Sequence, residues 1–254
     1  MTLSHAMTLS QENRMELANH TALITGGTAG IRLESARLMA QEGASVIIAG
    51  RNRHRGEEAV ALLGTSARFV EADMADAESV KALVRQCGDV DIIVNNAASF
   101  PAAMTVEQDP LTFARVFDTN VSGAYFLVAG LAPGMLARCR GSIVNITTLA
   151  AFKGIPGASG YSASKAALES LTRTWAAEFG ARGVRVNSVA PGPTRTEGVA
   201  VEWGETNEEL GRTLPLGRTA HASEIAEAVL FLASPRSSFV TGSTLHVDGG
   251  GAAV

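Results

Sequence analysis

Thr25-Gly26-Gly27-Thr28-Ala29-Gly30 is the stretch that decides the fold of this chain, because it joins a short apolar run at residues 21–24 to an amphipathic run at 31–41. A glycine-rich turn between a strand and a helix lets backbone N–H groups and the positive end of the helix dipole approach a phosphate closely. An ordinary tight loop is the alternative, but the strand–turn–helix context favours phosphate binding. We therefore expect a nucleotide site at this turn.

Short apolar runs alternate with helical stretches along the rest of the chain. Such runs suit parallel strands that helices cover on both faces, so the predicted fold is α/β, a single domain with a doubly wound parallel sheet of about seven strands. The predicted strands cover 21–24, 45–49, 67–70, 92–94, 142–146, 184–189 and 244–247, and the predicted helices include 31–41, 57–63, 77–87, 161–179 and 223–233.

Composition and charge exclude several classes of function. The chain has 254 residues with a net charge of -4 at pH 7 and no long basic run, so nucleic acid is not an expected partner. Cys87 and Cys139 lack the spacing of a metal site, and a reduced, cytoplasmic protein is expected. Residues 1–19 are predicted to be a polar tail and 20–254 the domain. No stretch approaches the roughly 18 apolar residues of a membrane span, so no membrane partner is expected.

Tyr161-Ser162-Ala163-Ser164-Lys165 lies in an alanine-rich stretch that is predicted to be helical. Residues four apart share one face of a helix, so the Tyr161 phenol and the Lys165 ammonium are expected to project into the same space. A cation there is expected to lower the tyrosine pKa from its usual value of about 10. The pair predicts a general acid/base for a carbonyl. A half-exposed aromatic residue beside a solvated lysine is the alternative for this spacing alone.

No carboxylate follows the second predicted strand, where an acidic residue would hold the ribose 2′-hydroxyl of NAD. The strand is followed by Arg51-Asn52-Arg53-His54-Arg55. Arginines near a helix N-terminus are disfavoured by the dipole unless an anion is present, so this cluster, with Arg51 foremost, predicts a 2′-phosphate. The predicted cofactor is NADP(H), with NAD(H) left open; a solvated loop is the alternative.

Taken in order, these motifs resemble the short-chain dehydrogenase/reductase family. The resemblance runs from about residue 20 nearly to the end of the chain. It rests on the glycine-rich turn, Asn95-Asn96-Ala97, Asn120, the strand at 142–146, the Tyr161–Lys165 pair and Val247-Asp248-Gly249-Gly250. It implies a Rossmann fold, a nicotinamide cofactor, and hydride exchange between an alcohol and a carbonyl.

The resemblance also implies the roles of single residues. Tyr161 would be the acid/base, Lys165 would hold the nicotinamide ribose and lower the Tyr161 pKa, and Asn120 would position a water in a proton relay. Thr148 stands where the family has the serine that steadies the substrate oxygen, and Asp73 would lie beside the adenine. The residues implied to bind the cofactor are Gly26, Thr28, Gly30, Ile31, Arg32, Arg51, Asp73, Asn96, Tyr161, Lys165, Pro191, Gly192 and Thr194.

Two further departures from the family pattern lie in the cofactor region. Arg32 replaces the last glycine of the turn motif, and its side chain could either pair with a phosphate or fill the cofactor channel. Both readings stay open at this point. Ala98 replaces a glycine that follows Asn95-Asn96-Ala97; if that position needs a positive φ, the alanine costs on the order of 1 kcal/mol.

The substrate side is predicted to be mostly apolar, which favours a small or medium apolar ketone or secondary alcohol. Residues 194–215 lie where the family has a mobile lid, and Trp203 could close on the substrate or anchor the loop; an ordinary surface loop is the alternative. The residues expected around the nicotinamide are Ser99, Phe100, Pro101, Leu149, Ala150, Ile155, Pro156 and Pro193.

The stretches 113–136 and 161–179 are too apolar for the surface of a monomer, so a homo-oligomer is expected, a tetramer or else a dimer. Two other classes of function are weighed. A non-catalytic binding or scaffold protein would explain Arg32, Ala98 and Thr148 as relaxed constraints, but Tyr161 and Lys165 argue against it. A methyltransferase would explain the glycine-rich turn and has no use for a tyrosine–lysine helix.

Overall fold

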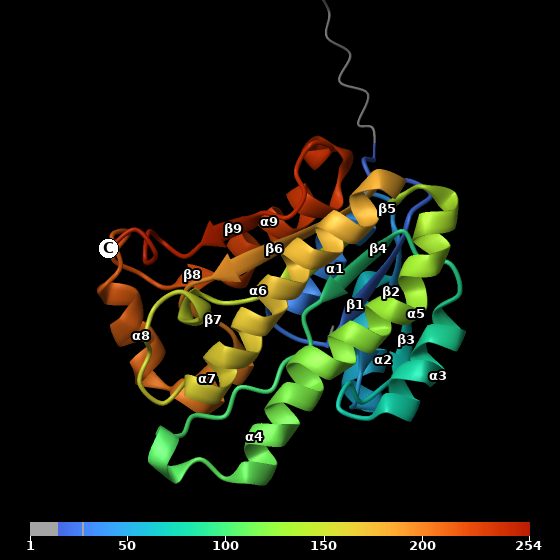
Figure 1. The fold of residues 1–254 in the computed structure, drawn as a ribbon. Coiled ribbons are helices and arrows are strands. Elements are labelled where there is room, and N and C mark those ends of the chain that lie inside the picture. Colours follow the sequence, from blue (N-terminus) through green and yellow to red (C-terminus); the bar gives the residue numbers. More distant parts are fainter. Residues whose placement is uncertain (1–14, 27) are drawn as a thin grey trace, which may run out of the picture.

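The computed structural model describes residues 15–26 and 28–254 and places a seven-stranded sheet at the centre of the protein (Figure 1). The strand order is β3-β2-β1-β4-β5-β6-β9, and every pairing is parallel. This confirms the predicted doubly wound sheet. The strands are β1 (Thr21–Thr25), β2 (Ser45–Gly50), β3 (Ala67–Glu71), β4 (Ile92–Asn95), β5 (Gly141–Ile146), β6 (Val184–Pro191) and β9 (Thr244–Val247).

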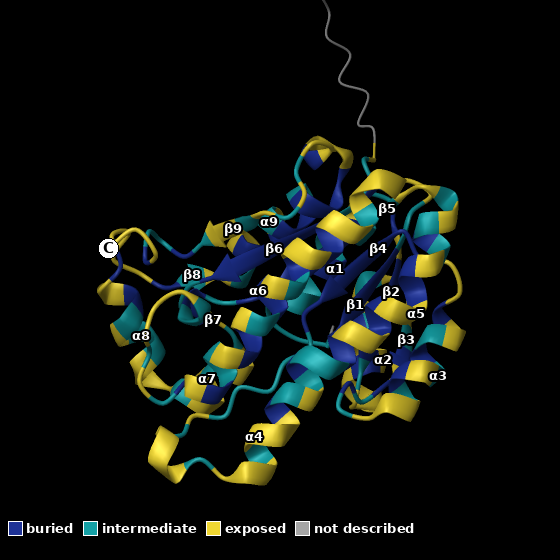
Figure 2. Cartoon of the chain, viewed as in Figure 1, coloured by how far each residue is buried: buried dark blue, intermediate teal, exposed yellow. Residues whose placement is uncertain are grey.

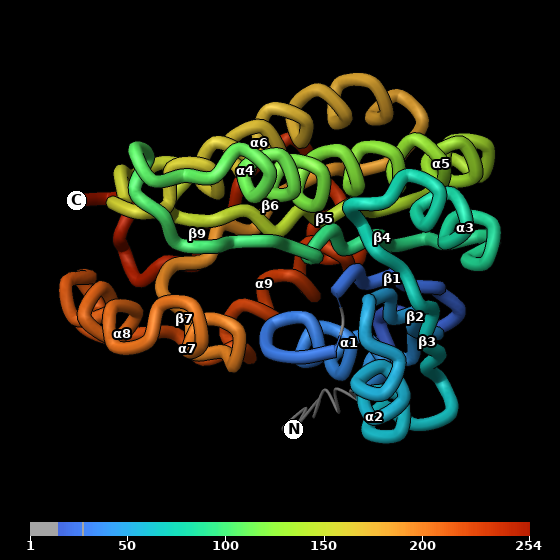
Figure 3. Tube along the Cα trace, turned by 90° about the horizontal axis from the view of Figure 1, so that it is seen from below, coloured from blue at the N-terminus to red at the C-terminus, as the bar shows by residue number. Residues whose placement is uncertain are grey.

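Helices cover both faces of the sheet (Figure 3). One face carries α1 (Ile31–Gln41), α2 (Arg53–Leu63) and α9 (Ala222–Ala233), and the other carries α3 (Ala77–Cys87), α5 (Gly123–Arg138) and α6 (Ser159–Phe179). The remaining helices are α4 (Pro110–Phe117), α7 (Glu197–Trp203) and α8 (Glu205–Arg212). A small parallel pair, β7 (Thr194–Arg195) and β8 (Ala220–His221), lies beside the main sheet.

The side chains of the strands alternate between two separate hydrophobic cores. In β1, Leu23 packs into the core beneath α3, α5 and α6, whereas Ala22 and Ile24 pack into the core beneath α1 and α9. Successive side chains of a strand point to opposite faces, so a strand that is buried on both faces is apolar at most positions. Figure 2 shows the resulting buried centre between the exposed outer faces of the helices.

Most predicted boundaries lie within two residues of those in the structure, and two differ by more. Helix α2 begins at Arg53 rather than at residue 57, because the Asn52 side chain accepts a hydrogen bond of 3.0 Å from the Arg55 N–H and caps the helix. Of the predicted polar tail, residues 15–19 pack against the domain, with Leu17 fully buried. Residues 1–14 and Gly27 lie outside the described residues.

One helical run, Pro110–Arg138, is long and apolar enough to span a membrane by length and composition, which the sequence analysis did not anticipate. It is formed by α4, a π-helical turn (Asp118–Ser122) and α5. Leu127, Leu131 and Met135 pack into the core, and 44% of the most apolar window is buried, so the run is accounted for as a core helix. Its other face exposes Phe113, Tyr125 and Phe126.

Candidate active site

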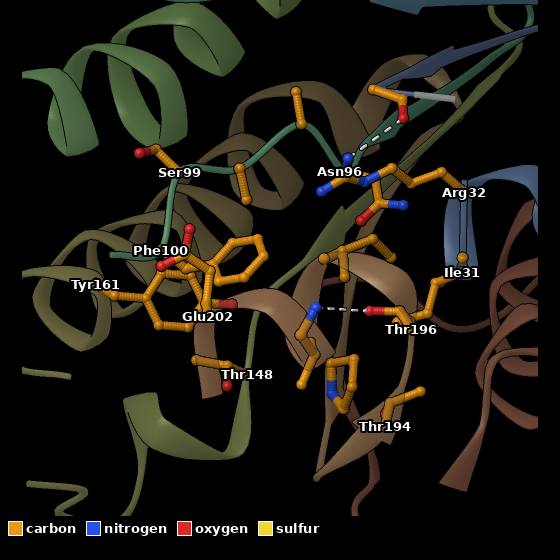
Figure 4. Close-up of a pocket in the computed structure, with 18 of the residues that line it drawn as sticks. Ile31, Arg32, Asn96, Ser99, Phe100, Thr148, Tyr161, Thr194, Thr196 and Glu202 are labelled. Carbon is orange, nitrogen blue, oxygen red and sulfur yellow. Dashed lines mark hydrogen bonds between the residues drawn. The ribbon is translucent and has the colours of Figure 1, made fainter. Parts of the chain in front are cut away.

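A cleft of about 940 Å³ opens at the carboxyl ends of the strands, where ligands bind in open α/β sheets. The glycine-rich turn forms one wall, and α6 and the segment after β6 form others (Figure 4). With the exception of Asn120, every predicted site residue lines this cleft: Gly26, Thr28, Gly30, Ile31, Arg32, Arg51, Asp73, Asn96, Thr148, Tyr161, Lys165, Pro191, Gly192 and Thr194.

The turn after β1 needs glycine at two described positions. Gly26 has φ of 73°, and a Cβ there would lie 3.1 Å from the Cα of Ala97. Gly30 has φ of 58°, and its Cβ would lie 2.9 Å from Thr196 Cγ2. Side chains at these positions would be strained and would fill the cradle, so the turn fits a diphosphate held by backbone N–H groups.

Thr25 fixes the end of β1 against the end of β4. Its Oγ1 accepts hydrogen bonds from the N–H groups of Asn96 and Ala97, both at 3.0 Å, and donates to the carbonyl oxygen of Val94 at 3.3 Å. The neighbouring Ala98 is not among the residues with positive φ, so its methyl group causes no backbone strain. The segment after β4 is therefore held rigidly beside the turn.

Tyr161 and Lys165 share one face of α6, as the spacing predicts. The Lys165 Nζ lies 5.9 Å from the centre of the Tyr161 ring and donates a hydrogen bond of 2.7 Å to the carbonyl oxygen of Ile146 at the end of β5. The lysine side chain is 1% exposed, which is exceptional for this residue type outside a functional site.

The pKa of Tyr161 moves in the opposite direction to the one predicted. Burial raises it to about 12, and the neighbouring Thr148 hydroxyl and the charge of Arg32 lower it by less. Burial also lowers the pKa of Lys165 to about 7; Arg32 lowers it further and Glu169 raises it. Desolvation disfavours the charged form of both groups, and for both it is the largest cause of the pKa shift.

Thr148 stands between β5 and a single 3-10 turn (Leu149–Ala151) that it caps. Its Oγ1 accepts a hydrogen bond of 3.2 Å from the Ala150 N–H. The hydroxyl hydrogen remains available to a ligand, so Thr148 keeps the donor that the replaced serine would supply.

Asn120 lies behind the cleft wall instead of lining it, and it is 1% exposed. Its Oδ1 accepts from the Ser99 N–H at 2.8 Å, and its Nδ2 donates to the Ser99 carbonyl oxygen at 2.9 Å and to Ser164 Oγ at 3.0 Å. The asparagine therefore ties the segment after β4 to α6. That segment places Phe100 against Tyr161, with ring centres 6.0 Å apart.

The arginines after β2 differ in their partners. Arg53 pairs with Glu71 at 2.9 Å, and Arg55 pairs with Glu197 at the start of α7, across the mouth of the cleft. Arg51 is exposed on the cleft wall, and no ion pair engages it within the described part of the chain. Of the three, Arg51 is the one that could bind a phosphate without first breaking an ion pair with a glutamate.

Asp73, which the resemblance places beside the adenine, is already engaged. Its Oδ1 accepts from the Ala75 N–H at 3.0 Å, and its Oδ2 accepts from Arg115 at 3.0 Å. Gly192 closes the other end of the cofactor region, where a Cβ would lie 2.8 Å from the Cα of Asp248. This close approach explains why the turn after β6 and the Asp248-Gly249-Gly250 motif occur together.

The predicted lid, 194–215, contains two short helices that the composition did not reveal. Thr196 caps α7 by accepting a hydrogen bond of 3.2 Å from the Val199 N–H, and Gly204 separates α7 from α8. Trp203 lines the cleft, whereas Pro156 does not. Sequence reasoning missed Lys153, Glu197 and Glu202 as lining residues; the Thr196–Glu197 helix start was the available signal for the last two.

Comparison with known proteins agrees with this geometry. The family profile described as "Enoyl-(Acyl carrier protein) reductase" matches residues 26–251. The 3-oxoacyl-acyl-carrier-protein reductase of Chlamydia trachomatis serovar D is 34% identical over 242 residues, which is 92% of this chain and 98% of that protein. The galactitol 2-dehydrogenase of Agrobacterium fabrum is 36% identical, covering 93% of this chain and 98% of that one.

A solved structure described as a "short chain dehydrogenase/reductase family protein" superimposes with a TM-score of 0.91 at 65% identity, covering 94% of this chain and 100% of that chain. Fold, motifs and relatives thus agree over nearly the whole described domain. The chain belongs to the short-chain dehydrogenase/reductase family of oxidoreductases, which act on CH–OH and C=O groups with NAD(P).

Proposed function

We propose that this protein is an NADP(H)-dependent oxidoreductase for a small or medium, mostly apolar ketone or secondary alcohol. One observation carries the proposal: Thr148, Tyr161 and Lys165 line the same cleft as the glycine-rich turn and Arg51. The bound nicotinamide would accept or supply the hydride. The protein's own residues supply the proton and the hydrogen bonds at the substrate oxygen.

Tyr161 and Thr148 are suited to act on one carbonyl oxygen. The Tyr161 phenol carries its proton at neutral pH, since burial raises its pKa to about 12. The Thr148 hydroxyl also acts on that pKa, so the two hydroxyl groups are neighbours. A carbonyl oxygen between them would accept a hydrogen bond from Thr148 and a proton from Tyr161, and the reverse transfers would serve alcohol oxidation.

Lys165 would stabilise the ionised form of the proton donor, Tyr161. Its Nζ is anchored to the Ile146 carbonyl oxygen at 2.7 Å and lies under the Tyr161 ring. A positive charge there stabilises the phenolate that remains after proton transfer, because a nearby cation favours the ionised form of a tyrosine. Both side chains line the cleft, so a bound substrate and cofactor would shield the reacting atoms from water.

The lining of the substrate side supports the proposed substrate class. Phe100, Leu149, Ile155 and Trp203 supply apolar surface around Tyr161. Glu202 adds one carboxylate to this surface, and Figure 4 shows it near Phe100 and Tyr161. Apolar walls with few polar groups are typical of sites for small organic molecules. The names of the relatives, among them a 3-oxoacyl-acyl-carrier-protein reductase and a galactitol 2-dehydrogenase, support a carbonyl or alcohol substrate without fixing its size.

A homo-oligomer, as a tetramer or a dimer, and a cytoplasmic location are part of the same proposal. The exposed Phe113, Tyr125 and Phe126 on α4 and α5 support the first, because such aromatic surface is commonly covered by a second subunit.

Titration with NADPH and, separately, with NADH tests the cofactor proposal. We expect tighter binding of NADPH, and we expect Arg51→Gln to weaken NADPH binding about tenfold or more while leaving NADH binding unchanged, because only NADPH carries the 2′-phosphate. Nucleotide fluorescence and the rise in melting temperature are the measurements. Arg53→Gln is the matched control, since it removes the same charge from a residue that Glu71 already engages. Tighter binding of NADH would contradict the NADP part and leave the oxidoreductase.

The pH dependence of carbonyl reduction is expected to follow Lys165. Its pKa is lowered to about 7, so the ammonium is present below that pH and is lost as the pH rises through it, while Tyr161 stays protonated up to about 12. We therefore expect kcat/KM, which reports the free enzyme, to fall above about pH 7. Glu169→Gln should move this limb to lower pH, because Glu169 raises the Lys165 pKa. A profile that is flat from about pH 6 to pH 9 would contradict the assignment.

A further inference from the structure

The Arg32 side chain crosses the cofactor region directly above the glycine-rich turn. A Cβ on Gly26 would lie 3.1 Å from Arg32 Cδ and 3.3 Å from its Nε, and Arg32 Nη1 donates a long hydrogen bond of 3.4 Å to the Gly26 carbonyl oxygen. In Figure 4 the side chain extends from α1 toward Asn96. The guanidinium group therefore lies inside the cleft.

Arg32 has no carboxylate partner within residues 15–26 and 28–254, and its one hydrogen bond is at the limit of length. Burial lowers its pKa, and the positive charge of Arg51 also lowers it, whereas Tyr161 raises it. A partly buried guanidinium with one weak contact is expected to gain from an anion beside it. We therefore expect an oxyanion to bind beside the Arg32 guanidinium in the cleft.

Asn96 provides a second, independent donor at the same place. Its side chain is 5% exposed, and no acceptor among the described residues reaches its Nδ2. Its backbone is fixed, because its N–H donates to Thr25 Oγ1 at 3.0 Å. Unpaired buried donors are rare in native proteins, and Asn96 is one of the residues that line the same cleft as Arg32.

The location of Arg32 identifies which part of a dinucleotide it would meet. Its charge interacts with Arg51 at the adenosine end and with Tyr161 and Lys165 at the nicotinamide end, so it lies between the two ends. A dinucleotide that extends from Arg51 to Tyr161 brings its central diphosphate to this point. Arg32 also belongs to the first turn of α1, where the helix dipole favours negative charge.

We propose that Arg32 and Asn96 form a pair of donors that binds the diphosphate of the cofactor, an inference that rests on the proposed dinucleotide-dependent function. The family glycine at this position lets the phosphates come close to the helix; this chain would add a charged contact at the same point. The guanidinium would exchange its long bond to the Gly26 carbonyl for a charge-assisted bond to a phosphate oxygen.

Binding of adenosine 5′-diphosphate by the full-length protein, followed by calorimetry, tests the proposal without turnover. We expect Arg32→Gln to weaken binding about tenfold or more and to flatten its dependence on salt. Arg37→Gln is the matched control: it removes the same charge from the same helix, at a residue that pairs with Glu34 at 2.9 Å on the surface, and should leave the affinity within about twofold. Inorganic pyrophosphate should raise the melting temperature of the wild type and not of Arg32→Gln.

Asn96→Leu tests the second donor, since it removes the Nδ2 hydrogens, nearly keeps the shape and adds no charge. We expect this variant to bind the diphosphate more weakly. In the double variant, the fold-decrease in affinity should be smaller than the product of the two single fold-decreases, because both donors bind one group. Unchanged or tighter binding by Arg32→Gln would overturn the proposal and show that the guanidinium obstructs the channel. A wild type that binds neither the diphosphate nor NADPH would overturn it as well.

The outcomes separate this inference from the proposed function. If Arg32→Gln weakens diphosphate binding but the wild type reduces no ketone, the diphosphate pair stands and the proposed function fails. If the wild type reduces ketones with NADPH and its diphosphate affinity does not depend on Arg32, the inference alone fails.

Discussion

Phenylalanine in place of Tyr161 is expected to lower kcat by about 10²–10⁴-fold, which is the range for loss of a general acid. The substitution removes one oxygen and leaves the ring, whose centre lies 6.0 Å from that of Phe100, in its packing. Thr148 supplies a hydrogen bond, and Lys165 is held by the Ile146 carbonyl oxygen, so neither is placed to replace Tyr161 as the proton donor.

Steady-state reduction of a ketone with NADPH measures the loss, and a nucleotide titration of the same variant should give an affinity close to that of the wild type. Tyr125→Phe is the matched control, because Tyr125 is the second of the two tyrosines in the chain, 45% exposed on α5 and outside the cleft. Near wild-type turnover by Tyr161→Phe would remove the tyrosine from the role of proton donor.

Alanine in place of Gly123 is expected to lower the melting temperature by roughly 5–10 °C. A Cβ on this first residue of α5 would lie 2.2 Å from the carbonyl oxygen of Met74 and 3.0 Å from its Cβ. Such a contact with a backbone atom cannot be relieved by a change of rotamer, so α5 must move away from the segment after β3. Because α5 and α3 cover the same hydrophobic core, the displacement of α5 loosens packing over a large area.

Gly180→Ala is the control for this prediction. Gly180 has nearly the same helical conformation, with φ of -58° and ψ of -40° against -60° and -45° for Gly123, and a Cβ there meets no atom within 4 Å. Its substitution should leave the melting temperature unchanged or raise it slightly, because alanine restricts the unfolded chain. Differential scanning calorimetry of the three proteins makes the comparison. Equal melting temperatures would show that the contact with Met74 relaxes at no cost.

The fold could be predicted from the sequence because its strands are buried on both faces. Such strands are mostly apolar, and the runs at β1, β2 and β4 were therefore visible without any partner. The beginnings of helices were harder where polar residues form the first turn. Helix α2 starts among arginines that composition assigned to a loop, and the capping bond from Asn52 becomes evident only with the geometry.

The sequence indicated which residues line the cleft, but it did not indicate the direction of their pKa shifts. Local spacing placed Tyr161 and Lys165 on one face of α6, but the direction of the tyrosine pKa shift depends on burial by distant segments, which spacing does not reveal. The same limit applies to Asn120, whose partners Ser99 and Ser164 come from separate elements. For Arg32 the sequence left two orientations open, and the three-dimensional neighbours of its guanidinium were needed to argue for one.

The order of the strands has a consequence for biosynthesis. β1 pairs with β2 early, but its other neighbour, β4, begins at Ile92, and the last pairing of the sheet joins Ser188 to Thr244. A chain emerging from the ribosome therefore carries an open edge at β6 until β9 is made. Parallel pairings between distant segments also form slowly, so the nascent protein is expected to depend on chaperones most between the synthesis of β6 and that of β9.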